Sequence, residues 1–155
     1  MKNARLFVAA ALAWAVFPLF GPAVSVAEEP PAGSVKTYRA PAWIQRGEER
    51  IPAEPGTRLF SGDTLGTGDG GAMGIVLQDN TLFSMGPESE LILTEFVFEP
   101  RENRFSLVAN MAKGTFSFLS GLIGKLSPDS AKIVTPVGTV GIRGTRFFAK
   151  VEAAK

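Results

Sequence analysis

The sequence contains no cysteine and no histidine among its 155 residues. Without cysteine, no disulfide can staple the fold and no thiol chemistry is available. Without histidine, the commonest general base and the commonest metal ligand are both missing. The charge balance is also close to neutral, with 16 basic and 15 acidic residues, so the strong positive charge typical of nucleic-acid binders is absent. These absences argue against a triad hydrolase, a thiol enzyme and a nucleic-acid-binding protein.

The N-terminus has the layout of a secretory signal peptide. Met1–Arg5 is short and basic, Leu6–Phe20 is an almost uninterrupted apolar run, and Ser25–Ala27 offers the small residues that a signal peptidase reads. The apolar run is short for a membrane span, which needs about 20 apolar residues. We therefore expect cleavage after Ala27 and a periplasmic or secreted bacterial protein, with a retained membrane anchor as the alternative. Cleavage leaves 155 − 27 = 128 residues, enough for one domain with a real core.

The remaining chain predicts an all-β fold. Seventeen glycines and eleven prolines accompany many short apolar runs, with turn signals about every 8–12 residues. Asp79-Asn80 lies between two such runs and predicts a hairpin. We expect residues 28–34 to form a flexible leader. Residues 35–151 are expected to form one compact domain, either a β-roll or solenoid-like fold or a jelly-roll-like sandwich.

Three stretches in order carry a family signature: "LFSGDTLGTGDGGAMGIVLQDNTLFSMGPESELIL", "LVANMAKGTFSF" and "IVTPVGTVGIRGTRFFAKV". Together they resemble the FecR domain, which is named for the periplasmic part of the iron-dicitrate regulator. The resemblance covers about residues 33–151, and each motif by itself is weak. The signature positions that we expect to be structural are Gly62, Asp63, Thr67, Gly68, Asp79, Gly114, Thr135, Pro136, Arg143, Gly144, Thr145 and Phe147.

The resemblance implies a mostly-β extracytoplasmic domain used in signalling and interaction, with no known catalytic residues and no cofactor. The full regulator also has a cytoplasmic anti-sigma segment, a membrane helix and a region that contacts a transporter. Here the domain follows the predicted signal peptide directly. We therefore expect a free-standing secreted FecR-domain protein whose partner is another envelope protein. The partner's identity, the signal and the oligomeric state stay open.

Acidic residues offer two further readings. Asp63, Asp69 and Asp79 lie in glycine-rich turns, where they could bind calcium or cap tight turns through their own backbone. The spacing of a calcium-binding helix-loop-helix is absent, so turn capping is favoured. The pairs Glu88/Glu90 and Glu95/Glu99 could serve glycoside hydrolysis, but neighbours on one strand do not face each other across a cleft. We interpret them as a charged strand face.

Apolar side chains suggest where a partner could bind. Phe96-Val97-Phe98 places three bulky residues in a row, and they cannot all point inward from one strand. "SFLSGLIGKLS" is an apolar loop, which favours either a partner or a lid. The predicted contact residues are Phe96, Phe98, Leu119, Leu122 and Ile123.

The closing stretch raises a problem of strand parity. Val140 and Ile142 share one face of a predicted strand, and continuing the alternation would turn Arg146 inward and Phe147 outward. A bulge at Gly144 would correct this, because one extra residue reverses the faces. Arg143 is then expected to pair with Asp63 or Asp79, or to cap carbonyl groups at the sheet end. The alternative role for Arg143 is to bind an anionic ligand.

These observations favour a non-enzymatic interaction or sensing module of the bacterial envelope that works through protein–protein contacts. The alternative is a binding module for an envelope glycan or another small ligand, using aromatic side chains and Arg143. An enzyme is the third and weakest hypothesis.

Overall fold

The computed structural model describes residues 29–144 and 146–153, which form an all-β domain, as predicted. The predicted signal peptide and Thr145 lie outside the described residues. The only helical segments in the described part are α1 (Ile123–Leu126) and two single 3-10 turns, Pro100–Glu102 and Pro128–Ser130. The strands are β1 (Gly33–Arg39), β2 (Ala42–Arg46), β3 (Glu49–Pro52), β4 (Arg58–Leu59), β5 (Thr64–Thr67), β6 (Ala72–Leu77), β7 (Leu82–Met85), β8 (Glu90–Glu99), β9 (Arg104–Leu119), β10 (Ala131–Thr135), β11 (Gly138–Gly141) and β12 (Arg146–Val151).

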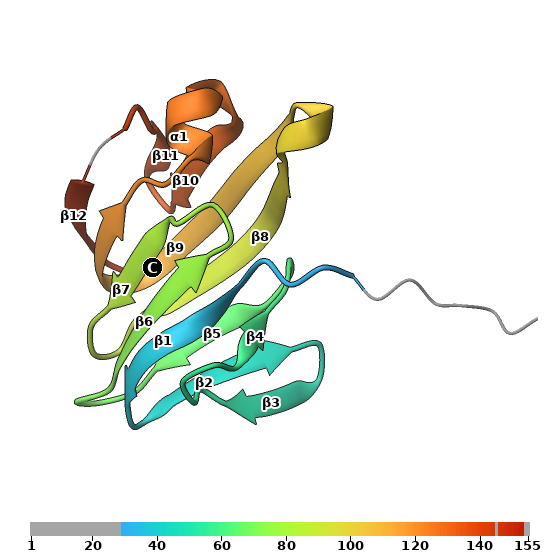
Figure 1. Cartoon of the computed structure of the whole chain (residues 1–155). Coiled ribbons are helices and arrows are strands. Elements are labelled where there is room, and N and C mark those ends of the chain that lie inside the picture. The colour runs from blue at the N-terminus through green and yellow to red at the C-terminus, as the bar shows by residue number, and fades with distance from the viewer. Residues whose placement is uncertain (1–28, 145, 154–155) are drawn as a thin grey trace, which may run out of the picture.

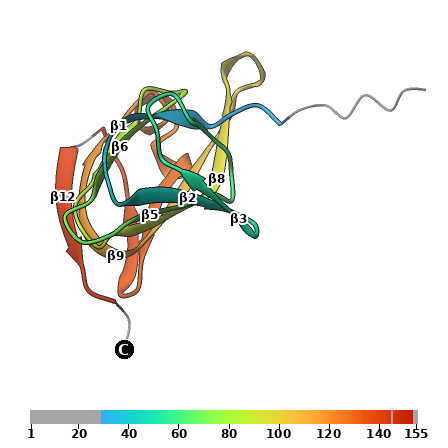
Figure 2. The same cartoon turned by 90° about the horizontal axis from the view of Figure 1, so that it is seen from below.

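The strands form one sheet that curls into a half-barrel (Figures 1 and 2). Its main path runs β3-β2-β5-β8-β9-β7-β6-β1-β4, and neighbours on it are antiparallel. Three strands are attached outside this path: β10 pairs in parallel with β9, β11 pairs with β10, and β12 pairs antiparallel with β9. Because the sheet curls, its two halves face each other and enclose the core.

The sixteen-residue strand β9 belongs to both halves of the sheet. Its first part pairs with β8 and β10, and its second part pairs with β7 and β12. The two parts meet at a bulge at Ala112, opposite the step from Glu90 to Leu91 in β8; Gly114, with φ of +106°, follows two residues later. One extra residue there reverses the faces of the strand, so the inward positions change from odd to even numbers. The buried residues are Leu107, Ala109 and Met111 before the bulge and Phe116 and Phe118 after it.

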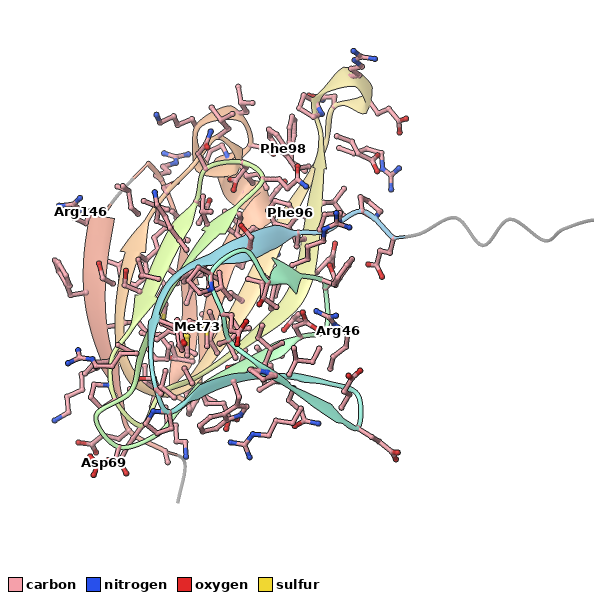
Figure 3. The ribbon with its side chains drawn as sticks, turned by 60° about the horizontal axis from the view of Figure 1, so that its bottom comes forward. Arg46, Asp69, Met73, Phe96, Phe98 and Arg146 are labelled. Carbon is pink, nitrogen blue, oxygen red and sulfur yellow. The ribbon has the colours of Figure 1, made fainter. Side chains whose placement is uncertain are left out.

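The core is apolar and contains a small aromatic cluster. Phe118 lies edge-on to Phe83 and stacks on Phe147, with ring centroids 5.0 Å apart in both pairs. Met73 of β6 points into the same interior (Figure 3). Each aromatic pair adds about 0.5–1.5 kcal/mol beyond the area that it buries. The cluster joins β7, β9 and β12, and thereby fixes β12 to the rest of the sheet.

The expected flexible leader is partly wrong, because its second half is built into the sheet. Ala32 is buried, its N–H donates to the carbonyl of Leu59 at 2.7 Å, and its carbonyl accepts from the N–H of Gln78 at 2.9 Å. Strand β1 begins at Gly33 rather than at Val35. The sequence "PPAGS" reads as a linker, but Ala32 and Gly33 are small enough to lie against neighbouring backbone, which the composition alone does not reveal.

Candidate interaction surface

Five polar side chains are buried in the described part of the chain: Asp63, Thr67, Asp79, Thr81 and Ser89. Burying a polar group is costly unless it is hydrogen-bonded. Each of these five has a hydrogen-bond partner, and no side-chain nitrogen or oxygen buried in the described residues lacks one. The five belong to three networks, which decide whether the signature residues are available for a ligand.

The first network holds the turn before β5. Arg46 of β2 donates through two nitrogens to the two oxygens of Asp63, at 2.8 Å each. Asp63 also accepts from the N–H of Phe60 at 2.9 Å, while the guanidinium of Arg46 lies 4.5 Å from the centre of the Phe60 ring. Hydrogen bonding to Asp63 raises the pKa of Arg46 above its ordinary value. The Asp63 carboxylate, which the sequence analysis considered as a calcium ligand or as the partner of Arg143, is therefore paired with Arg46.

The second network lies beside the bulge in β9. The hydroxyl of Thr67 donates to the carbonyl of Gly86 at 2.6 Å and accepts from the N–H of Ser89 at 2.9 Å. The hydroxyl of Ser89 in turn accepts from the N–H of Thr115 at 3.0 Å. A side chain at Gly114 would collide with Ser89, both with its hydroxyl and with its backbone. These residues close the end of the half-barrel where β5, β7 and β9 meet.

The third network ties the hairpin between β6 and β7 to the apolar loop before α1. Asp79 accepts from the N–H and hydroxyl of Thr81 at 3.0 and 2.8 Å, and from the N–H of Ile123 at 3.1 Å. Its carbonyl accepts from the N–H of Leu122 at 2.7 Å. Asp79 therefore caps its own turn and also holds a loop more than 40 residues away in the sequence.

The C-terminal signature contains a correction. Gly144 has φ of +51° but lies in a bend between β11 and β12, so the predicted strand bulge at Gly144 is wrong. The chain leaves the sheet after β11 and rejoins it beside β9. The inward and outward alternation of β12 is therefore independent of that of β11, and no bulge is needed. Arg146 is exposed and Phe147 packs against the core. The two side chains thus face as predicted, although no strand bulge at Gly144 places them.

The other C-terminal signature residues lie nearby. Thr135 donates from its hydroxyl to the carbonyl of Gly138 at 2.9 Å, across the turn that contains Pro136. Arg143 follows the buried Ile142, in the same bend as Gly144. The two acids proposed as partners of Arg143 are engaged as described above, with Arg46 and with the Thr81–Ile123 region.

The predicted contact residues are only partly accessible. Ile123 is fully buried in the core, so its assignment to a contact surface is wrong; the tether from Asp79 turns it inward. Phe96 and Phe98 pack partly against the core (Figure 3), because a bulge between Leu93 and Glu95 brings both to the inner side. Leu119 is half-buried, and Leu122 is 38% exposed.

Sequence reasoning missed the most exposed apolar residues. Val137 is 97% exposed in the β10–β11 turn, and Phe148 is 78% exposed on the outer face of β12. A groove of about 640 Å³ lies beside Phe148 on the outer face of β7, β9 and β12. The sequence did indicate one exposed phenylalanine here, because Phe147 and Phe148 are adjacent in a strand and cannot both face the core. The groove is lined by Ser84, Met85, Gly86, Thr115, Phe116, Ser117, Phe148, Ala149 and Lys150.

A family model described as FecR protein matches residues 63–155. The chain belongs to the FecR family. No curated protein and no solved structure gives a significant match. FecR proteins act in signalling at the bacterial envelope, and the family is a regulatory one rather than a known enzyme family. Within the described residues, no helix has the length and hydropathy needed to cross a membrane.

The FecR match begins at Asp63 and contains all three buried networks apart from Arg46 and Phe60 of the first one. It also contains five of the six large hydrophobic residues that are exposed in the described part of the chain. These five are Leu122, Leu126, Val137, Val140 and Phe148, and the sixth is Tyr38 of β1. In the FecR region, the buried polar side chains are thus hydrogen-bonded within the protein, while large apolar side chains are exposed on its surface.

Proposed function

We propose that this FecR protein is a non-enzymatic interaction and sensing module of the bacterial envelope. It acts after export and removal of residues 1–27, by contact with another envelope protein. The observation that carries the proposal is the distribution of side chains in the FecR region. The buried polar side chains there hold turns, and the exposed apolar side chains of α1, β11 and β12 are available to a partner. Exposed apolar surface of this kind is typical of interaction sites.

Photo-crosslinking in intact cells tests this proposal. A photoreactive phenylalanine analogue replaces Val137 or Phe148 in one strain each, and exposed Glu48 of the β2–β3 turn in a control strain. We expect a discrete crosslinked product from at least one of the first two positions and none from Glu48. Mass spectrometry then identifies the partner. The absence of any protein adduct from positions 137 and 148 would count against a protein-binding module.

A second candidate function rests on the groove beside Phe148. Its lining combines the hydroxyl groups of Ser84, Thr115 and Ser117 with the ring of Phe148, and small-ligand sites typically combine apolar or aromatic side chains with a few such polar groups. This favours an envelope glycan or another small ligand as the alternative. A glycan array distinguishes the two: saturable binding that is lost in Phe148→Ala supports the alternative, and uniformly flat binding removes it.

A further inference from the structure

Four strands in the described part of the chain pair on one side only: β3, β4, β11 and β12. Free edges invite pairing with other chains, and proteins blunt them with short strands, proline or charge. Three of the four are blunted by their length or sequence. Strand β4 has two residues, β3 has four and ends in Pro52, and β11 has four and is bounded by Gly138 and Gly141.

Strand β12 is different. It has six residues without proline or glycine, and it lies at the periphery of the half-barrel in both ribbon views (Figures 1 and 2). All six residues pair with β9 on one side, and within residues 29–144 and 146–153 no strand pairs with its other side. The inner positions Phe147, Ala149 and Val151 pack against the core, which holds the strand in an extended form. The main-chain N–H and C=O groups on its outer edge can therefore pair with one more strand.

The outer face of β12 carries a specific pattern. Arg146, Phe148 and Lys150 alternate along it and are all exposed (Figure 3 labels Arg146). Neither Arg146 nor Lys150 forms an ion pair with any described residue. The groove next to Phe148 contains no acidic residue in its lining. A strand added beside β12 would therefore meet a positive, an aromatic and a positive group in turn.

We infer that the free edge of β12 binds an extended acidic segment of a partner protein by β-strand addition. The partner segment would present Glu or Asp, then an apolar residue, then Glu or Asp, at alternate positions on the outer face. Directly opposed side chains of opposite charge stabilise a strand pair, whereas like charges destabilise it. Main-chain hydrogen bonds supply affinity and the alternate side chains supply specificity. This inference rests on the proposed function and names the chemistry of the partner.

The same pattern disfavours a second copy of this chain. Antiparallel pairing of two β12 strands with Phe148 opposite Phe148 would set Arg146 of one copy against Lys150 of the other. Both cross-strand charge pairs would then be repulsive. Arg146 and Lys150 thus keep identical copies apart and select an acidic strand.

The test is binding of synthetic peptides to the chain expressed from its full sequence and purified as the cell processes it. The acidic probe is Thr-Glu-Thr-Leu-Thr-Glu-Thr, and the basic probe has Lys in place of both Glu residues. Each sequence reads the same in both directions, so the result does not depend on strand orientation. We expect the acidic probe to bind at least tenfold more tightly than the basic one, with affinity falling as salt is raised.

Charge reversal and backbone methylation make the test specific. The double variant R146E/K150E should reverse the preference of the two probes, while its thermal melting stays close to that of the wild type because both side chains are exposed. A further acidic probe carries N-methyl groups on every residue from the second to the sixth, so that both edges of the peptide are blocked. We expect this probe to lose binding, because strand addition needs main-chain N–H groups that face β12 in either strand orientation.

Several outcomes would overturn the inference: equal binding of the acidic and basic probes, binding of neither, or full retention of binding by the methylated acidic probe. A wild-type dimer that Phe148→Asp disrupts would also overturn it, by assigning the edge to a second copy. If the probes fail while a photoreactive group at Val137 or Phe148 still captures an envelope protein, the proposed function survives and the inference about β12 does not.

Discussion

At the scale of single residues, buried polar side chains in this protein mainly hold backbone groups in place. Thr67 and Ser89 bond to backbone groups of neighbouring strands and turns, and Asp79 bonds to two N–H groups. The sequence indicated turn roles for Asp63 and Asp79, because Asp next to Gly or Asn favours tight turns. It could not indicate that Arg46 meets Asp63, since that contact joins separate strands and depends on the fold.

Gly114 combines a positive φ with close contacts for any added side chain. We predict that Gly114→Ala lowers the free energy of unfolding by about 1–3 kcal/mol, because a residue with a side chain is strained at positive φ. The added methyl group would also collide with Ser89. Thermal or urea unfolding measures the effect. Gly141→Ala is the matched control, since nothing lies near its position and its φ is not in the left-handed region; equal losses in both variants would contradict the argument.

At the scale of elements, the sequence predicted features that depend on neighbouring residues, but not features that depend on contacts between distant parts of the chain. The hairpin at Asp79-Asn80 was predicted correctly because both strands and the turn lie within a short window. A bulge was expected at Gly144, but the structure has one in β8 at Thr94 and one in β9 at Ala112. The sequence did contain the clue, since the apolar positions of residues 104–119 change from odd to even numbers at that point. Ile123 was misplaced because its burial depends on a hairpin distant in the sequence.

The link between that hairpin and α1 gives an element-scale prediction. Asp79→Ala should destabilise the protein by about 1–3 kcal/mol, because it leaves buried N–H donors without acceptors. Hydrogen exchange should speed up at the amides of Thr81 and Ile123, which donate to the carboxylate. Asp69→Ala is the control, because Asp69 is exposed in the β5–β6 turn (Figure 3). Unchanged exchange at Ile123 in Asp79→Ala would show that the tether is not what holds the loop.

At the scale of the whole molecule, composition was sufficient for the all-β class and insufficient for the closure of the sheet. Short strands with frequent glycine fit several β architectures equally well. The half-barrel depends on β9 pairing with β7, β8, β10 and β12, and such long-range register is set by packing rather than by local preference. Adjacent Phe147 and Phe148 indicate that one of the two faces outward, but the position of β12 at a free edge follows from that register and from no local pattern.

Export is also a property of the whole chain. We predict that the protein recovered from the periplasm or medium has the mass of residues 28–155, because Ser25-Val26-Ala27 offers small residues at the cleavage positions. Ala27→Phe should block processing and leave the full-length mass, while Glu29→Gln should not. Intact-protein mass spectrometry distinguishes the forms. A wild-type chain that keeps residues 1–27 would favour the retained anchor instead.

The position of β9 has a consequence for the order in which the chain is made. Each half of β9 has one partner strand that precedes it, β8 or β7, and one that follows it, β10 or β12. During synthesis from the N-terminus, β9 therefore exists with one open side until residues 131–151 emerge. A ribosome that stalls before Ala131 would release a chain with a long, hydrophobic, unpaired strand edge, which is a template for aggregation. Residues 131–151 therefore cover the last open side of β9, and a chain that lacks them exposes that edge.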